Sequence, residues 1–243
     1  SMEIRNFDTH LEFWLNFKNE KPVIISEKWI YEFLSKINNI NENLPLFIFA
    51  PSGIAGADIN NMSNMSKEKA KEFSVLGNEM IKSIINYTPV VHGFFGKYLL
   101  GGGLEFALSC DVLSVTEECK IGFPEVTLGI IPGFFGIDLS YHRNNIQLYE
   151  LLFTGQVLSI KKQKYNNIFN YVEENWEELE ALKNVYLKAY ENVSYKVVKK
   201  VKERLLYLKC IDTYQTSSEL FSDTFEEIEQ IEMMKTFLNR KKK

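Results

Sequence analysis

Two glutamates and a run of glycines are the residues in this chain whose types and spacing could do chemistry. Gly101, Gly102 and Gly103 open an apolar helical pattern, and Glu105 falls within its first turn. Backbone N–H groups at a helix N-terminus can approach an anion closely when no side chain intervenes. Glu125 follows on a different predicted element. The pattern indicates an anion-stabilising backbone site beside two acid/base groups, which suits chemistry on a carbonyl whose oxygen becomes negative.

Each glutamate also has a simpler interpretation. Glu105 could merely favour the positive end of the helix dipole, although burial among Leu104 and Phe106 would raise its pKa and make a bystander charge costly. Glu125 follows Pro124 where a strand ends, and an isolated glutamate there could be an ordinary surface residue. The functional interpretation therefore depends on the two glutamates occurring together with the glycines.

Three further blocks extend the pattern. Ala55-Gly56-Ala57-Asp58-Ile59 lies upstream, Leu128-Gly129-Ile130-Ile131-Pro132-Gly133 lies downstream, and the tail carries Met234-Lys235-Thr236-Phe237-Leu238-Asn239-Arg240-Lys241. In order and spacing, the series from about residue 45 to 155 resembles the crotonase superfamily, and within it the enoyl-CoA hydratases. The tail resembles the C-terminal segment of the same family.

The resemblance implies a role for each of five positions. Glu105 would orient and activate water, and Glu125 would exchange a proton with the substrate α-carbon. Ala57 and Gly102 would donate backbone N–H groups to the thioester oxygen, and Gly133 would help to hold the attacking water. The implied reaction is reversible addition of water across a trans-2-enoyl thioester of coenzyme A, a lyase reaction that needs no metal and no redox cofactor.

The sequence departs from the family pattern in two places. Phe134 and Phe135 stand where hydratases usually have small residues; they would shorten or reshape the acyl pocket if they point inward, and core packing is the alternative. Near the N-terminus, Val23-Ile24-Ile25-Ser26 replaces a longer family segment that contains an Asn. A shortened first strand pair would alter the grip on coenzyme A and would permit an acyl-carrier-protein thioester instead.

Other functions remain open at this level. An enoyl-CoA isomerase, or another crotonase reaction such as decarboxylation or carbon–carbon cleavage, could use the same oxyanion site, and a non-catalytic acyl-thioester-binding protein could keep the fold. Retention of both Glu105 and Glu125 favours the hydratase. His92 and His142 are weaker candidates, because a lone histidine is usually structural. Asp58 is interpreted as a helix or turn cap.

Alternating strands and helices predict an α/β fold. Helices are expected over 26–37, 66–86, 146–153, 176–190, 194–208 and 215–238, with another capped by Ser159. Strands are expected over 45–50, 89–95, 112–115 and 121–123. The resemblance implies a crotonase-like ββα superhelix core, assigned to residues 2–190 with a shortened N-terminus. Residues 191–243 would form a C-terminal helical subdomain that supports a homotrimer or hexamer.

Bulk properties narrow the class of protein. The formal net charge of −4 provides no basic field for nucleic acid. No apolar run is long enough for a membrane span, and no signal-peptide core is recognisable. Cys110, Cys119 and Cys210 have no metal-like or disulfide-framework spacing, and the first two are expected to be buried. These features predict a cytoplasmic protein.

Overall fold

Strands alternate between two sheets along the chain, and helices follow the strand pairs. The computed structural model describes residues 2–161, 166–209 and 214–242. One sheet has the order β1-β2-β4-β6-β8-β11, in which only the β1–β2 pair is antiparallel. Its strands are β1 (Met2–Asn6), β2 (Leu11–Leu15), β4 (Leu46–Ala50), β6 (Val91–Phe95), β8 (Val112–Thr116) and β11 (Tyr171–Glu173).

The second sheet has the order β10-β9-β7-β5-β3, in which only the β10–β9 pair is antiparallel. Its strands are β3 (Val23–Ile25), β5 (Ile54–Ala57), β7 (Tyr98–Leu100), β9 (Lys120–Gly122) and β10 (Val157–Ser159). Successive strand pairs β2/β3, β4/β5, β6/β7 and β8/β9 each place one strand in each sheet. This winding is the ββα superhelix, so the predicted α/β fold is confirmed.

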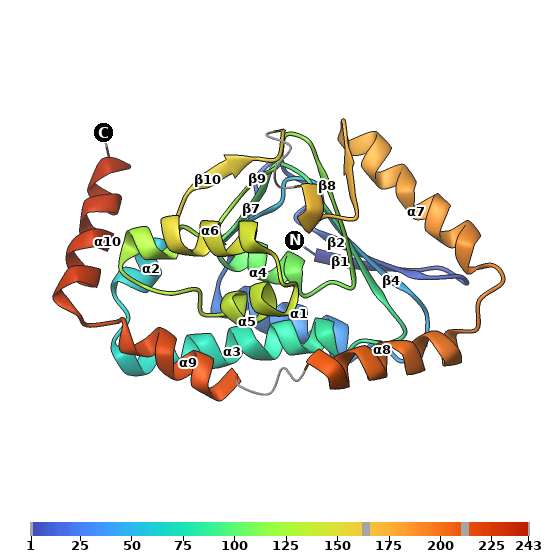
Figure 1. Ribbon diagram of the computed structural model, residues 1–243, viewed down its shortest axis with the longest axis horizontal. Helices are drawn as coiled ribbons and strands as arrows, with labels where there is room; N and C mark the ends of the chain where they lie inside the picture. The colour runs from blue at the N-terminus through green and yellow to red at the C-terminus, as the bar shows by residue number, and fades with distance from the viewer. Residues whose placement is uncertain (1, 162–165, 210–213, 243) are drawn as a thin grey trace.

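Helices fill the connections and form the C-terminal region (Figure 1). The α-helices are α1 (Glu27–Asn38), α2 (Ile59–Ser63), α3 (Lys67–Ile85), α4 (Gly102–Leu108), α5 (Gly136–His142), α6 (Ile146–Thr154), α7 (Trp176–Tyr190), α8 (Tyr195–Lys209), α9 (Tyr214–Asp223) and α10 (Ile228–Arg240). Two short 3₁₀ helices are η1 (Pro124–Leu128) and η2 (Asn166–Ile168). Figure 1 shows α9 running along α3, α10 beside α2, and α7 at the opposite end of the molecule.

Local signals account for the helices that the sequence predicts well. The hydroxyls of Ser26 and Ser66 accept from the backbone N–H groups of Trp29 and Lys69, which begins α1 and α3 where expected. Gly155 ends α6 with a φ of +65°, as a glycine C-cap does. Among the described residues, no helix is both long and apolar enough to cross a bilayer. Cys110 and Cys119 are buried as predicted, and Cys210 lies outside the described residues.

Two helix predictions are wrong. The single helix expected over 215–238 is divided into α9 and α10, because Glu226 adopts a left-handed φ of +67°, which a continuous α-helix does not allow. Ser159 does not begin a helix; it is the last residue of β10 and pairs with Lys120 of β9. The β1–β2 hairpin adds the outer edge of the first sheet, and no residue range was predicted for it.

Candidate active site

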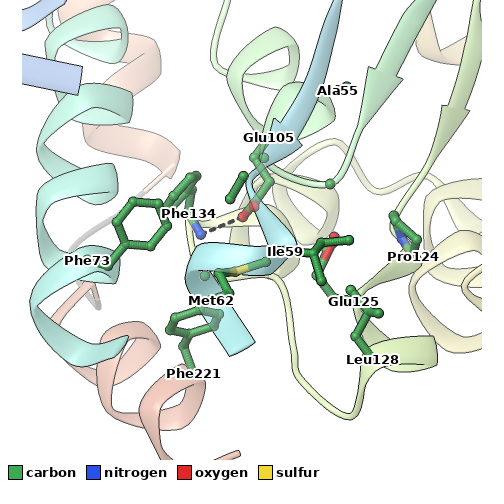
Figure 2. Close-up of a pocket in the computed structure, with 15 residues that line it drawn as sticks. Ala55, Ile59, Met62, Phe73, Glu105, Pro124, Glu125, Leu128, Phe134 and Phe221 are labelled. Carbon is green, nitrogen blue, oxygen red and sulfur yellow. Dashed lines mark hydrogen bonds between the residues drawn. The ribbon is translucent and has the colours of Figure 1, made fainter. Parts of the chain in front are cut away.

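A small cavity of about 60 Å³ lies where the predicted motifs converge. Residues from β5, α2, α3, α4, η1, the loop before α5, and α9 line it (Figure 2). The lining residues are Ala55, Gly56, Ala57, Ile59, Met62, Phe73, Gly101, Gly102, Glu105, Pro124, Glu125, Leu128, Gly133, Phe134 and Phe221. Glu105 and Glu125 are therefore two buried carboxyl groups on an otherwise mainly apolar wall.

The Glu105 carboxylate is held by two backbone donors. Its Oε2 accepts from the N–H groups of Phe134 and Gly136, each at 2.6 Å. Phe135, between them, has a left-handed φ of +66°, which turns both N–H groups toward one point and forms a small anion-binding nest. Burial raises the pKa of Glu105 to about 8, and the two N–H donors counteract part of that rise.

Glu125 has the opposite surroundings. It lies in the first turn of η1, buried, and neither carboxyl oxygen has a hydrogen-bond partner among the described residues. Burial, together with the nearby charge of Glu105, raises its pKa well above the ordinary value, and its own backbone amide acts in the opposite direction. A carboxyl group without donors in an apolar site favours its protonated form.

Gly101 makes the close approach of Glu125 possible. A Cβ atom at this position would lie 3.0 Å from both Glu125 carboxyl oxygens, and the φ of +54° disfavours any other residue. Gly102 follows as the first residue of α4, so its N–H has no intrahelical acceptor. β5 runs alongside: a Cβ at Gly56 would lie 3.5 Å from the Gly102 nitrogen. The backbone of residues 55–57 and the start of α4 thus share one wall with the carboxyl groups.

The two phenylalanines diverge. The Phe134 ring lines the cavity and packs edge-to-face on Phe73, with ring centroids 5.3 Å apart. Phe135 is buried too, but it is not among the described residues that line the cavity. Gly133 does line it, and a Cβ there would lie 2.8 Å from the Phe221 ring. Phe134 therefore points into the cavity, whereas Phe135 packs in the core.

Six of the seven predicted site residues line this cavity, and the weaker histidine candidates do not. His92 lies on the sheet face covered by α7, with Nε2 2.5 Å from the Tyr190 hydroxyl, and burial lowers its pKa to about 3. His142 ends α5 beside a separate cavity. Asp58 caps α2, as expected, by accepting from the Asn60 N–H at 2.9 Å.

Sequence reasoning missed three apolar lining residues: Met62, Phe73 and Phe221. Met62 lies one turn beyond Ile59, the last residue of the Ala55–Ile59 block, so continuation of that block into a short helix was a usable signal. Phe73 and Phe221 come from α3 and α9, far apart in the chain, and no local pattern distinguishes them from other buried aromatic residues. Across the described residues, no three His, Cys, Asp or Glu side chains gather as a metal site.

Comparison with known proteins identifies the family. The family model described as enoyl-CoA hydratase/isomerase matches residues 48–243. The short-chain-enoyl-CoA hydratase of Clostridium acetobutylicum is 30% identical over 216 residues, which cover 86% of this chain and 82% of that protein. The chain belongs to the enoyl-CoA hydratase/isomerase family. The predicted membership of the crotonase superfamily is therefore confirmed.

Other members of the enoyl-CoA hydratase/isomerase family agree with this assignment. A probable enoyl-CoA hydratase of Bacillus subtilis is 28% identical over 77% of this chain and 75% of its own length. The crystal structure of an enoyl-CoA hydratase from Bacillus halodurans superposes with a TM-score of 0.84 at 18% identity, covering 97% of this chain and 99% of that one. At that identity the superposition supports the family fold.

A second, larger cavity of about 460 Å³ adjoins the first. The two share Ala55, Ala57, Ile59, Pro124 and Leu128 in their linings. The far side of the larger cavity is formed by α10, whose Phe237 and Leu238 contribute apolar surface. Lys241, directly after α10, holds its ammonium group 5.0 Å from the centre of the Phe237 ring. An elongated ligand with its reacting end beside Glu105 could extend through this space.

Proposed function

We propose that this protein is an enoyl-CoA hydratase, a lyase that reversibly adds water across the double bond of a trans-2-enoyl-CoA. One observation carries the proposal: two buried carboxyl groups with opposite hydrogen-bond surroundings line the same cavity as the start of α4. The names of the relatives from Clostridium acetobutylicum and Bacillus subtilis support the same reaction.

The hydrogen bonds support a proposed assignment of the acid and the base. Two N–H donors stabilise the anionic form of Glu105, whereas Glu125 has no such donors among the described residues. Two interacting carboxyl groups whose surroundings push their pKa values apart share one proton unequally. The proton therefore resides on Glu125, which serves as the acid, and Glu105 serves as the base.

The proposed reaction uses both carboxyl groups in turn. Water attacks C3 of the enoyl group while Glu105 accepts one of its protons, and the double-bond electrons move to give a thioester enolate. The backbone N–H groups of Ala57 and Gly102 receive the enolate oxygen, which is the kind of contact that lowers such barriers most. Glu125 delivers its proton to C2, and transfer of a proton from Glu105 to Glu125 resets the pair.

Cavity size and shape support a short acyl group. The space beside the carboxyl groups is about 60 Å³ and is walled by Phe73, Phe134 and Phe221. The larger adjoining cavity under α10 would take the pantetheine arm of coenzyme A. We therefore propose a four-carbon enoyl thioester as the preferred substrate; the name of the Clostridium relative specifies a short chain.

Replacing Phe134 with Leu is expected to extend the usable chain length. The substitution removes ring volume from the acyl wall but keeps the backbone N–H that holds Glu105. We expect the ratio of kcat/KM for trans-2-octenoyl-CoA to that for crotonyl-CoA to rise about tenfold or more, the usual scale for pocket-size discrimination. The control is Phe33→Leu, which trims a buried ring outside the cavity and should leave the ratio unchanged. If the ratio is unchanged in Phe134→Leu, Phe134 does not limit the length of the acyl chain.

An exposed apolar stripe supports the proposed homotrimer. Val197, Val201, Leu205 and Leu208 recur at helical spacing on α8 and are each about half exposed in the single chain. Such a stripe on a helix is normally covered by another surface. Light scattering after size-exclusion chromatography should give three times the 28.3 kDa chain mass, or six times for a pair of trimers. A monomeric mass would contradict the assignment.

The experiment that tests the function is hydration of trans-2-enoyl-CoAs of graded chain length, followed by loss of the conjugated thioester absorbance. Turnover with a maximum at four carbons supports the proposal. Absence of turnover by folded protein would overturn hydration of coenzyme A esters. Matching carrier-protein thioesters and a 3-enoyl-CoA isomerisation assay would then identify which related reaction the site performs.

A further inference from the structure

A chain of buried polar side chains ends on the loop that holds Glu105. Ser74 and Asn78 lie one turn apart on α3, and Ser218 faces them from α9; all three are fully buried. The Ser74 hydroxyl lies 2.5 Å from the Gly133 carbonyl oxygen and 3.1 Å from the Ser218 hydroxyl. Asn78 donates through Nδ2 to Ser218 Oγ at 2.8 Å. None of these three is among the described residues that line the cavity.

The peptide group between Gly133 and Phe134 links this chain of side chains to Glu105. The Gly133 carbonyl and the Phe134 N–H belong to the same planar peptide group and point to opposite sides. Ser74 donates to the carbonyl on one side, and on the other side the N–H donates to Glu105 Oε2 at 2.6 Å. The hydrogen bond from Ser74 on α3 therefore orients this peptide plane, and the orientation of the plane determines where its N–H meets the Glu105 carboxylate.

The direction of the hydrogen bonds is determined as well. A carbonyl has no proton, so the single Ser74 proton is donated to Gly133, and Ser218 must donate its own proton to Ser74. The order is then Asn78 N–H to Ser218, Ser218 to Ser74, Ser74 to the peptide, and the peptide N–H to Glu105. Every dipole points its positive end toward the carboxylate, and aligned hydrogen bonds in a low-dielectric interior polarise one another.

We propose that Ser74, supported by Ser218 and Asn78, is a positioning residue that orients the Gly133–Phe134 peptide and thereby holds the Glu105 carboxylate in its catalytic geometry. The inference rests on the proposed role of Glu105 as the base. It also gives α9 a task in catalysis: this helix supplies Ser218 to the network and the Phe221 ring to the cavity wall. Packing of a C-terminal helix would thus be coupled to the orientation of the base.

The test compares Ser74→Ala, Ser74→Cys and Ser218→Ala with Ser83→Ala. Ser83 is a matched control, because it lies on the same helix and its hydroxyl donates only to the Met80 carbonyl of its own helix among the described residues. We expect Ser74→Ala to lower kcat about threefold to tenfold with KM changed less than twofold, the usual effect of one lost hydrogen bond. The acidic limb of the pH–rate profile of Ser74→Ala should move to higher pH. Ser74→Cys should have an intermediate kcat, because a thiol is a weak donor. Ser218→Ala should change kcat and the profile in the same direction as Ser74→Ala.

A titration keeps the proposal testable without turnover. The Glu105 carboxyl group is followed by ¹³C NMR of glutamate-labelled protein in a Glu125→Gln background, with Glu105→Gln for assignment. Ser74→Ala is expected to raise the pKa of Glu105 by about 0.5, since the anion loses part of its stabilisation. If wild type fails to hydrate any enoyl thioester but this rise occurs, positioning stands and the proposed function falls. Folded Ser74→Ala with an unchanged pKa, or Ser74→Cys equal to wild type, would overturn the positioning role.

Discussion

Glu125→Gln and Glu105→Gln are each expected to lower kcat for enoyl-CoA hydration about a hundredfold to ten-thousandfold, the range typical of a lost general acid or base. Glutamine keeps the volume of each side chain. It cannot deliver a proton to C2 at position 125, and it cannot accept one from water at position 105. Because both groups are buried in the same cavity, no other carboxyl group among the described lining residues can substitute for either.

The measurement is steady-state hydration of crotonyl-CoA across the pH range. In wild type, kcat/KM should rise with pH through about 8, because Glu105 must lose its proton to act as base. Glu105→Gln should lack that limb. Exposed Glu118, on the turn before β9, provides the control substitution Glu118→Gln, which should leave both rate and profile unchanged. Retention of more than a tenth of wild-type kcat in either cavity variant would reject the acid/base assignment.

The same two substitutions are expected to stabilise the fold at alkaline pH. A carboxyl group whose folded pKa is raised stays protonated in the native state while it ionises in the unfolded chain. The free energy of unfolding is therefore highest, as far as Glu105 contributes to it, at low pH. It falls as the pH rises from the ordinary pKa of 4.5 to the folded-state pKa of about 8. At about 1.4 kcal/mol per pH unit across that window, the loss is at most about 5 kcal/mol.

Urea unfolding at pH 5 and at pH 9 measures the effect. Wild type should lose several kcal/mol of unfolding free energy between the two values, and Glu105→Gln should lose clearly less. The exposed Glu118→Gln variant should follow wild type. Parallel pH dependences in wild type and Glu105→Gln would mean that Glu105 is ionised at ordinary pH without cost. The expected result would instead show a site that gains its reactivity at the expense of stability.

Local signals in the sequence determined much of the frame. Ser26 and Ser66 cap the helices that follow them, and Gly155 ends α6, because each acts on backbone groups within a few residues. The strands β4, β6 and β8 were recognisable as short apolar runs since they are buried on both faces. Motif order placed Glu105, Glu125 and the backbone of Ala57 and Gly102 in one family pattern.

Tertiary structure decided which side chains complete the cavity. Phe134 and Phe135 are identical neighbours, yet only the Phe134 ring lines the cavity, whereas Phe135 is buried elsewhere in the core. At the left-handed Glu226, which separates α9 from α10, the carboxylate accepts a hydrogen bond from a distant segment, the Lys67 N–H at the start of α3, at 3.0 Å. Ser74, Ser218 and Phe221 reach the site from helices far apart in the chain. Their roles depend on contacts between distant segments, which no local pattern of residues specifies.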